Sequence, residues 1–177
     1  GVNLEGELPK GATATDLTLR ITELLRAEKV VGKFVEFHGE GAKQLSLADR
    51  ATISNMAPEY GATMGFFPID EKSLEYLRLT GRDESKISLI KDYLSEQGLF
   101  GIPEKGTIHY SKTIDLNLSG IVPAVAGPKR PQDLIAVTDL KDKFKTLIDS
   151  SVADGGFNLD SSTLDTEYSF EYNHSDK

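Results

Sequence analysis

The chain has 177 residues, a length typical of one domain or of one domain with part of another. It contains no apolar run near the roughly 20 residues that a membrane-spanning helix needs. It has no cysteine, which excludes disulfides and thiolate-held metal sites within these residues, and its net charge of -8 gives no overall basic surface for nucleic acid. The three histidines are far apart in sequence, so a zinc site is not expected.

The acidic charge is concentrated at the end of the sequence. Residues 151–177 hold six acidic residues against one basic residue, Lys177, while residues 127–147 are mildly basic. A shift of composition like this indicates a boundary, and the acidic tail reads most simply as a solvated region.

The first third of the chain predicts a strand, a helix and a second strand. Residues 1–6 alternate weakly, as a short strand does. Thr13 or Thr15 can cap a helix that has Asp16 in its first turn. One apolar stripe at helical spacing follows, made of Leu17, Ile21, Leu24 and Leu25. Residues 33–38 are aromatic and β-branched, which favours a strand.

The next segment predicts a turn, a capped helix and a buried strand. Residues 39–41 are typical of a turn. Ser46 and Asp49 form a capping-box pattern, and the helix that follows runs through residues 55 and 56. Pro58 near its end is expected either to kink the helix or to mark its last turn. Residues 61–68 predict a buried strand, with Met64 in the core.

The remaining sequence predicts helices at 71–79, 84–97 and 138–149. Residues 107–118 alternate as one or two strands, residues 121–131 read as a connector, and residues 168–172 are a strand candidate. The alternation of strands and helices through residue 118 predicts the α/β class, with helices on a sheet.

One local feature suggests chemistry. Asn55 and Glu59 are four residues apart and share a helix face if the helix continues through Pro58. An amide and a carboxylate at a helix end marked by proline could meet a polar ligand together. The alternative is that Asn55 ends the helix and Glu59 is exposed, and the spacing alone leaves both interpretations open.

Four longer strings resemble the aconitase family and keep its order: Val31–Gly41 (VGKFVEFHGEG), Leu47–Thr63 (LADRATISNMAPEYGAT), Gly65–Asp70 (GFFPID) and Ala126–Asp133 (AGPKRPQD). The resemblance covers about residues 1–147 and is strongest to the monomeric branch of bacterial and cytosolic members, which includes the iron-regulatory proteins. Residues 148–177 resemble nothing that we can place.

The resemblance implies an internal piece of a longer enzyme, because members of this family are several times longer. Three cysteines of a Ser-Cys-Thr-Asn and a Cys-x-x-Cys segment, both downstream, hold the family's [4Fe–4S] cluster, so no cofactor is expected in this chain itself. The implied fold is a three-layer α/β/α sandwich over residues 1–125. Residues 126–177 would be the linker and the start of the cluster-bearing domain, with the acidic tail at 151–177.

The resemblance also gives two site residues their roles in the full-length enzyme. Asn55 aligns with an asparagine that hydrogen-bonds around the cluster, and Glu59 aligns with a catalytic glutamate near the open iron and the substrate hydroxyl. His38 matches no catalytic histidine of the family and is interpreted as structural. Asp49 and Arg50 are expected to make helix-surface or interdomain contacts.

The leading hypothesis is therefore a fragment of a cytoplasmic [4Fe–4S] hydro-lyase that interconverts citrate and isocitrate through cis-aconitate. The fragment alone is expected to be inactive, its partner being the rest of the parent chain. RNA binding, known in iron-regulatory relatives, is expected only for the full-length form without its cluster, and no membrane partner is expected. The alternatives are a fragment of a 2-methylcitrate or related 2-hydroxy-acid dehydratase, and a stand-alone non-catalytic α/β module.

Overall fold

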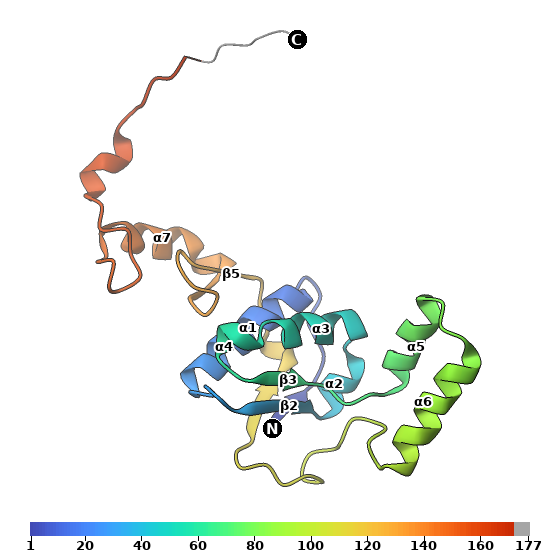
Figure 1. The fold of residues 1–177 in the computed structure, drawn as a ribbon. Helices are drawn as coiled ribbons and strands as arrows, with labels where there is room; N and C mark the ends of the chain where they lie inside the picture. Colours follow the sequence, from blue (N-terminus) through green and yellow to red (C-terminus); the bar gives the residue numbers. More distant parts are fainter. Residues whose placement is uncertain (172–177) are drawn as a thin grey trace, which may run out of the picture. The chain divides into compact units, whose positions relative to one another are not determined.

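The structure of the chain is a computed structural model that describes residues 1–171 (Figure 1). The chain divides into two compact units: the first spans Gly1–Val137 and the second begins at Thr138. The boundary predicted between residues 125 and 126 concerns domains of a longer protein and stays a prediction. No helix within residues 1–171 is long and apolar enough to cross a membrane.

A parallel sheet of four strands forms the centre of the first unit, in the order β3-β2-β1-β4. The strands are β1 (Val2–Glu5), β2 (Phe34–His38), β3 (Met64–Phe66) and β4 (Ile114–Asn117). Val2 pairs with Phe37 of β2 and with Ile114 of β4, so these three side chains lie on one face of the sheet. The hydrophobic core of the unit lies against that face.

Three helices pack on the core side of the sheet: α1 (Ala14–Ala27), α3 (Leu47–Asn55) and α4 (Ala57–Tyr60) (Figure 1). Of the two predicted caps of α1, Thr13 is the one present, and it forms a capping box: its side chain accepts from the backbone N–H of Asp16, and its own N–H donates to the Asp16 carboxylate at 2.7 Å. Leu17, Ile21 and Leu25 of the predicted stripe are buried. The predicted α/β class, a parallel sheet flanked by helices, is confirmed.

The sequence predicts a turn at residues 39–41, but the structure has the start of a short helix there, α2 (Glu40–Gln44). Gly39 has φ +92°, and a Cβ there would lie 2.3 Å from Asn3 Oδ1. A Cβ on Gly41 would lie 2.9 Å from the carbonyl oxygen of Leu4. The glycines therefore serve a close approach of this helix to β1, which the sequence pattern alone does not distinguish from a turn.

Two further helices, α5 (Glu71–Leu79) and α6 (Glu84–Glu96), pack against each other (Figure 1). The segment after them differs from its prediction: residues 107–113 form no strand, and only residues 114–117 of the predicted region join the sheet. Tyr110 stacks its ring on His38 of β2, with centroids 5.1 Å apart.

The connector predicted at 121–131 contains a strand. It is β5 (Ala124–Ala126), which pairs antiparallel with β6 (Leu134–Ala136), after the short 3₁₀ helix η1 (Leu118–Gly120). The backbone N–H of Ala124 also donates to the buried carboxylate of Asp16 at 2.8 Å. Burial raises the pKa of Asp16, but the hydrogen bonds from Thr13 and Ala124 outweigh it and leave the pKa lowered.

The second face of the sheet carries exposed apolar side chains at β2 and β3. Phe34 pairs with Met64, and the register also brings Phe66 to this face. Met64 is 37% exposed, so its predicted place in the core is wrong. It sits at the start of an edge strand on the face opposite the core, a position that local hydrophobicity does not reveal.

The second unit is built on α7 (Leu140–Asp149), which follows the 3₁₀ helix η2 (Val137–Asp139). The chain then folds back on the end of α7, where the N–H groups of Phe157 and Leu159 donate to the carbonyls of Leu147 and Ile148. A last 3₁₀ helix, η3, spans Ser161–Asp165. The strand predicted at 168–172 does not form in residues 168–171, and Tyr172 lies outside the described residues.

Candidate functional site

The two predicted site residues lie on either side of the break between α3 and α4 at Met56, which we call the corner. Helix α3 begins at a capping box, in which Ser46 accepts from the N–H of Asp49, and it ends at Asn55. Met56, with φ −88° and ψ 16°, belongs to neither helix interior. Pro58 stands in the first turn of α4, where its missing N–H costs nothing. The helix therefore does not continue through Pro58, and its predicted place at a kink or in a last turn is wrong.

The corner exposes Asn55 and half-buries Glu59. Oε2 of the Glu59 carboxylate is buried and has no hydrogen-bond partner among residues 1–171. A buried acceptor without a donor costs free energy, so such an atom marks a place where a donor is missing. A ligand hydroxyl, a bound water or another part of a longer chain could supply that donor.

Backbone hydrogen bonds attach α4 to the loop before β2. Gly61 ends α4 in the left-handed conformation at φ +90°, and its carbonyl accepts from the N–H of Gly32 at 3.2 Å. The N–H of Thr63 donates to the carbonyl of Lys33 at 2.8 Å. The corner is thus attached to the sheet through its C-terminal end.

Arg50 makes a buried ion pair that the sequence analysis did not find. Its side chain is 1% exposed and donates two hydrogen bonds of 2.8 Å to the two carboxylate oxygens of Asp70. Asp70 also caps α5, because it accepts from the backbone N–H groups of Lys72 and Ser73. The expectation of a helix-surface or interdomain contact for Arg50 is therefore wrong. Its spacing of three residues from the buried Ile53 of the same helix is the signal that could have shown an inward-facing arginine.

His38 behaves as a core residue, in agreement with the structural interpretation. It is 1% exposed, and neither ring nitrogen has a hydrogen-bond partner within the described part of the chain. Burial lowers the pKa of His38 below its ordinary value of 6.5. The imidazole is therefore held neutral, stacked on Tyr110.

This lowered pKa predicts a pH dependence of stability. The unfolded state binds the His38 proton more tightly than the folded state does. The contribution of neutral His38 to the free energy of unfolding is therefore complete above about pH 6.5 and is lost as the pH falls through the folded pKa. We expect His38→Phe, which keeps the ring stack, to reduce this fall in the free energy of unfolding. Urea unfolding between about pH 5 and 7 measures it. His109→Gln is the control that should retain the fall, and an unchanged slope in His38→Phe would contradict the assignment.

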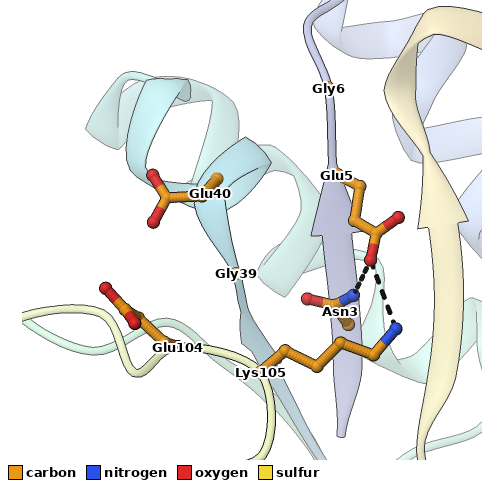
Figure 2. Close-up of a pocket in the computed structure, with 7 residues that line it drawn as sticks. All are labelled: Asn3, Glu5, Gly6, Gly39, Glu40, Glu104 and Lys105. Carbon is orange, nitrogen blue, oxygen red and sulfur yellow. Dashed lines mark hydrogen bonds and ion pairs between the residues drawn. The ribbon is translucent and has the colours of Figure 1, made fainter.

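A pocket of about 450 Å³ lies where β1 and β2 end (Figure 2). Its lining residues are Asn3, Glu5, Gly6, Gly39, Glu40, Glu104 and Lys105. The carboxyl ends of parallel strands commonly bind ligands, so the polar groups of this pocket form a second candidate site.

Asn3, Glu5 and Lys105 of this pocket share a network of hydrogen bonds and ion pairs with Asp115, while Asn3 Oδ1 is buried without a partner among the described residues. Asn3 Nδ2 donates to Glu5 at 2.7 Å, and Lys105 Nζ lies 3.3 Å from the same carboxylate oxygen (Figure 2). Asn3 Nδ2 also donates to Asp115 at 2.9 Å, and Lys105 Nζ lies 2.9 Å from that oxygen. The hydrogen bonds from Lys105 and then Asn3 lower the pKa of Asp115. This network attaches the segment around residue 105 to β1 and β4, so we assign it a structural role.

The described residues hold no group of three or more His, Cys, Asp or Glu side chains that could bind a metal ion. The orphaned oxygen of Glu59 would fit a place beside a ligand that carries a hydrogen-bond donor.

Comparison with known proteins gives a consistent result. The sequence model described as "Aconitase family (aconitate hydratase)" matches residues 1–174. The chain is 52% identical over all 177 residues to aconitate hydratase A of Staphylococcus epidermidis and 49% identical over 177 residues to that of Staphylococcus aureus. It is 51% identical over 167 residues, 94% of the chain, to aconitate hydratase A of Deinococcus radiodurans. These matches cover 20%, 20% and 18% of the three relatives, so the chain spans about a fifth of their length.

Proposed function

Because the chain belongs to the aconitase family, we propose that it is an internal part of an aconitate hydratase. The parent enzyme would be a cytoplasmic hydro-lyase that interconverts citrate and isocitrate through cis-aconitate. Identities near 50% over the whole chain to proteins named aconitate hydratase A support this assignment. The partners we propose are the rest of the parent chain and the tricarboxylic acid substrates.

The observation that carries the proposal for the site is the orphaned oxygen of Glu59. When bound, a [4Fe–4S] cluster with one iron free of cysteine supplies a Lewis acid for the substrate hydroxyl and carboxylate. We propose that Glu59 Oε2 accepts or returns the proton of that hydroxyl, which would give the buried oxygen its missing donor. The exposed amide of Asn55 would hydrogen-bond around the cluster and adjust its position and potential.

Because the sequence contains no cysteine, we propose a division of function between this chain and the rest of the enzyme. The residues that hold the cluster would lie outside these 177, and Glu59 would act on a substrate bound elsewhere in the parent. With its net charge of -8, this part of the protein is a poor match for RNA by itself, so any RNA binding would belong to the full-length form without its cluster.

This division predicts that the 177-residue chain, purified and incubated with iron and sulfide, neither acquires an iron–sulfur chromophore nor hydrates cis-aconitate. The natural protein treated in the same way is the control and should show both. Visible absorption and the loss of cis-aconitate absorbance measure the two properties. Hydration by the 177-residue chain would contradict the proposed division, and an inactive natural protein would contradict the proposed function.

A further inference from the structure

Tyr60, the last residue of α4, connects the two sides of the corner that carries Asn55 and Glu59. Its side chain is fully buried, and its phenol Oη donates to the carbonyl oxygen of Ile53 at 3.3 Å. Ile53 lies in the last turn of α3, and its carbonyl oxygen also accepts from the backbone N–H of Met56 at 3.3 Å. The phenol therefore ties the end of α4 to the end of α3.

Gly65 of β3 provides the space for this contact. A Cβ at Gly65 would lie 2.2 Å from Tyr60 Oη, 3.3 Å from Phe37 Cε2 and 3.4 Å from the Cα of Ser54. The φ of Gly65 is not in the left-handed region, so space and not backbone conformation excludes a side chain there. The phenol thus lies between β3 and the last turn of α3.

Helix α4 has four residues and cannot be stable by itself, so its position depends on its anchors. Glu59 directly precedes Tyr60, and its backbone N–H bonds to the carbonyl of Met56 at 3.1 Å. Burial raises the pKa of the Tyr60 phenol, and the negative charge of Glu59 raises it further.

We propose that Tyr60 is a positioning residue for the reaction: its phenol, in the space left by Gly65, fixes where the Glu59 carboxylate stands relative to Asn55. The inference rests on the proposed function of Glu59 and goes beyond it by giving Tyr60 and Gly65 a part in turnover. Small displacements of a reacting group cost rate more than they cost substrate binding.

A double-mutant cycle in the full-length enzyme tests this. We expect Gly65→Ala, whose Cβ collides with the phenol oxygen, to lower kcat about tenfold or more, with KM for citrate changed by less than about twofold. Tyr60→Phe should lower kcat about 3- to 10-fold, since it removes one hydrogen bond. In the double variant the colliding atom is gone, so its kcat should equal that of Tyr60→Phe.

Thr22→Val is the matched control. It also removes a buried hydroxyl that donates to a backbone carbonyl, that of Thr18 at 2.8 Å, but inside α1. It should lower thermal stability and leave kcat unchanged. Two results of the cycle would overturn the proposal: a Gly65→Ala variant with wild-type kcat, or a Gly65→Ala substitution that lowers kcat equally in the wild-type and Tyr60→Phe backgrounds. If Gly65→Ala does not fold, wild-type kcat in Tyr60→Phe overturns the proposal.

A second readout does not depend on activity. In the 177-residue chain, Tyr60→Phe should speed hydrogen exchange of the Glu59 and Gly61 amides, which bond to the carbonyls of Met56 and Ala57, more than that of amides in α1. Equal changes in both places would contradict the local role. Glu59→Gln, measured with the same assay, separates the positioning role of Tyr60 from the proposed function of Glu59. If only Glu59→Gln lowers kcat, the positioning role alone fails. If Glu59→Gln keeps kcat, the proposed function of Glu59 fails.

Discussion

Glu59→Gln in the full-length enzyme is expected to lower kcat about 100-fold or more with little change in KM, because a positioned general acid or base typically contributes a factor of about 10² to 10⁴. The amide has the size of the carboxylate but cannot take up a proton. In this structure Glu59 Oε2 is buried without a partner, so the substitution removes no hydrogen bond among the described residues. Steady-state kinetics with citrate and with isocitrate measure the effect.

Two comparisons make this result specific to the site. Glu96→Gln, at the exposed end of α6, should leave kcat and KM unchanged. Thermal unfolding of Glu59→Gln should match that of the unchanged enzyme, which shows that the lost turnover is not lost folding. Unchanged turnover in Glu59→Gln would remove this residue from the site.

The largest effect on stability is expected at the buried pair of Arg50 and Asp70. Asp70→Ala leaves the Arg50 charge, whose side chain is 1% exposed, without its partner, and breaking such a pair costs about 3–5 kcal/mol in the free energy of unfolding. It also removes the cap of α5, which contributes about 1 kcal/mol. Urea unfolding of the 177-residue chain measures the sum.

Asp70→Ser separates the two contributions, since serine can cap a helix but cannot neutralise an arginine. We expect Asp70→Ser to lose most of what Asp70→Ala loses, and Arg50→Met combined with Asp70→Ser to recover a large part of the loss. A cost below about 1 kcal/mol for Asp70→Ala would contradict the importance of the pair.

The predictions that held depend on residues close in sequence. Thr13 caps α1 and Ser46 forms the predicted capping box with Asp49, because a cap involves residues three apart. The buried stripe of α1 likewise follows from helical spacing. Local chemistry decides these features, whatever the rest of the chain does.

The features that were missed depend on partners far along the chain. Arg50 meets Asp70 twenty residues later, and β5 pairs with a strand that begins beyond a loop. Helix α2 exists because two glycines let it approach Leu4 of β1. A single sequence read in order does not contain these pairings, which arise only when the elements pack.

The candidate site was predicted by resemblance and not by spacing. Asn55 and Glu59 would share one helix face only if the helix continued through Pro58, and in the structure they flank a corner at Met56. The missing side chain of Gly65 is meaningful only once the Tyr60 phenol is seen to fill its place.

The central claim is that these residues form part of an aconitate hydratase, and the most direct test is hydration of cis-aconitate by the natural protein that contains them. Its 2-methyl analogue, assayed in parallel, tests the choice of substrate. We predict that the reconstituted protein converts cis-aconitate to citrate and isocitrate and processes the methylated compound more slowly. No hydration of cis-aconitate after reconstitution, or a preference for the methylated substrate, would contradict the account.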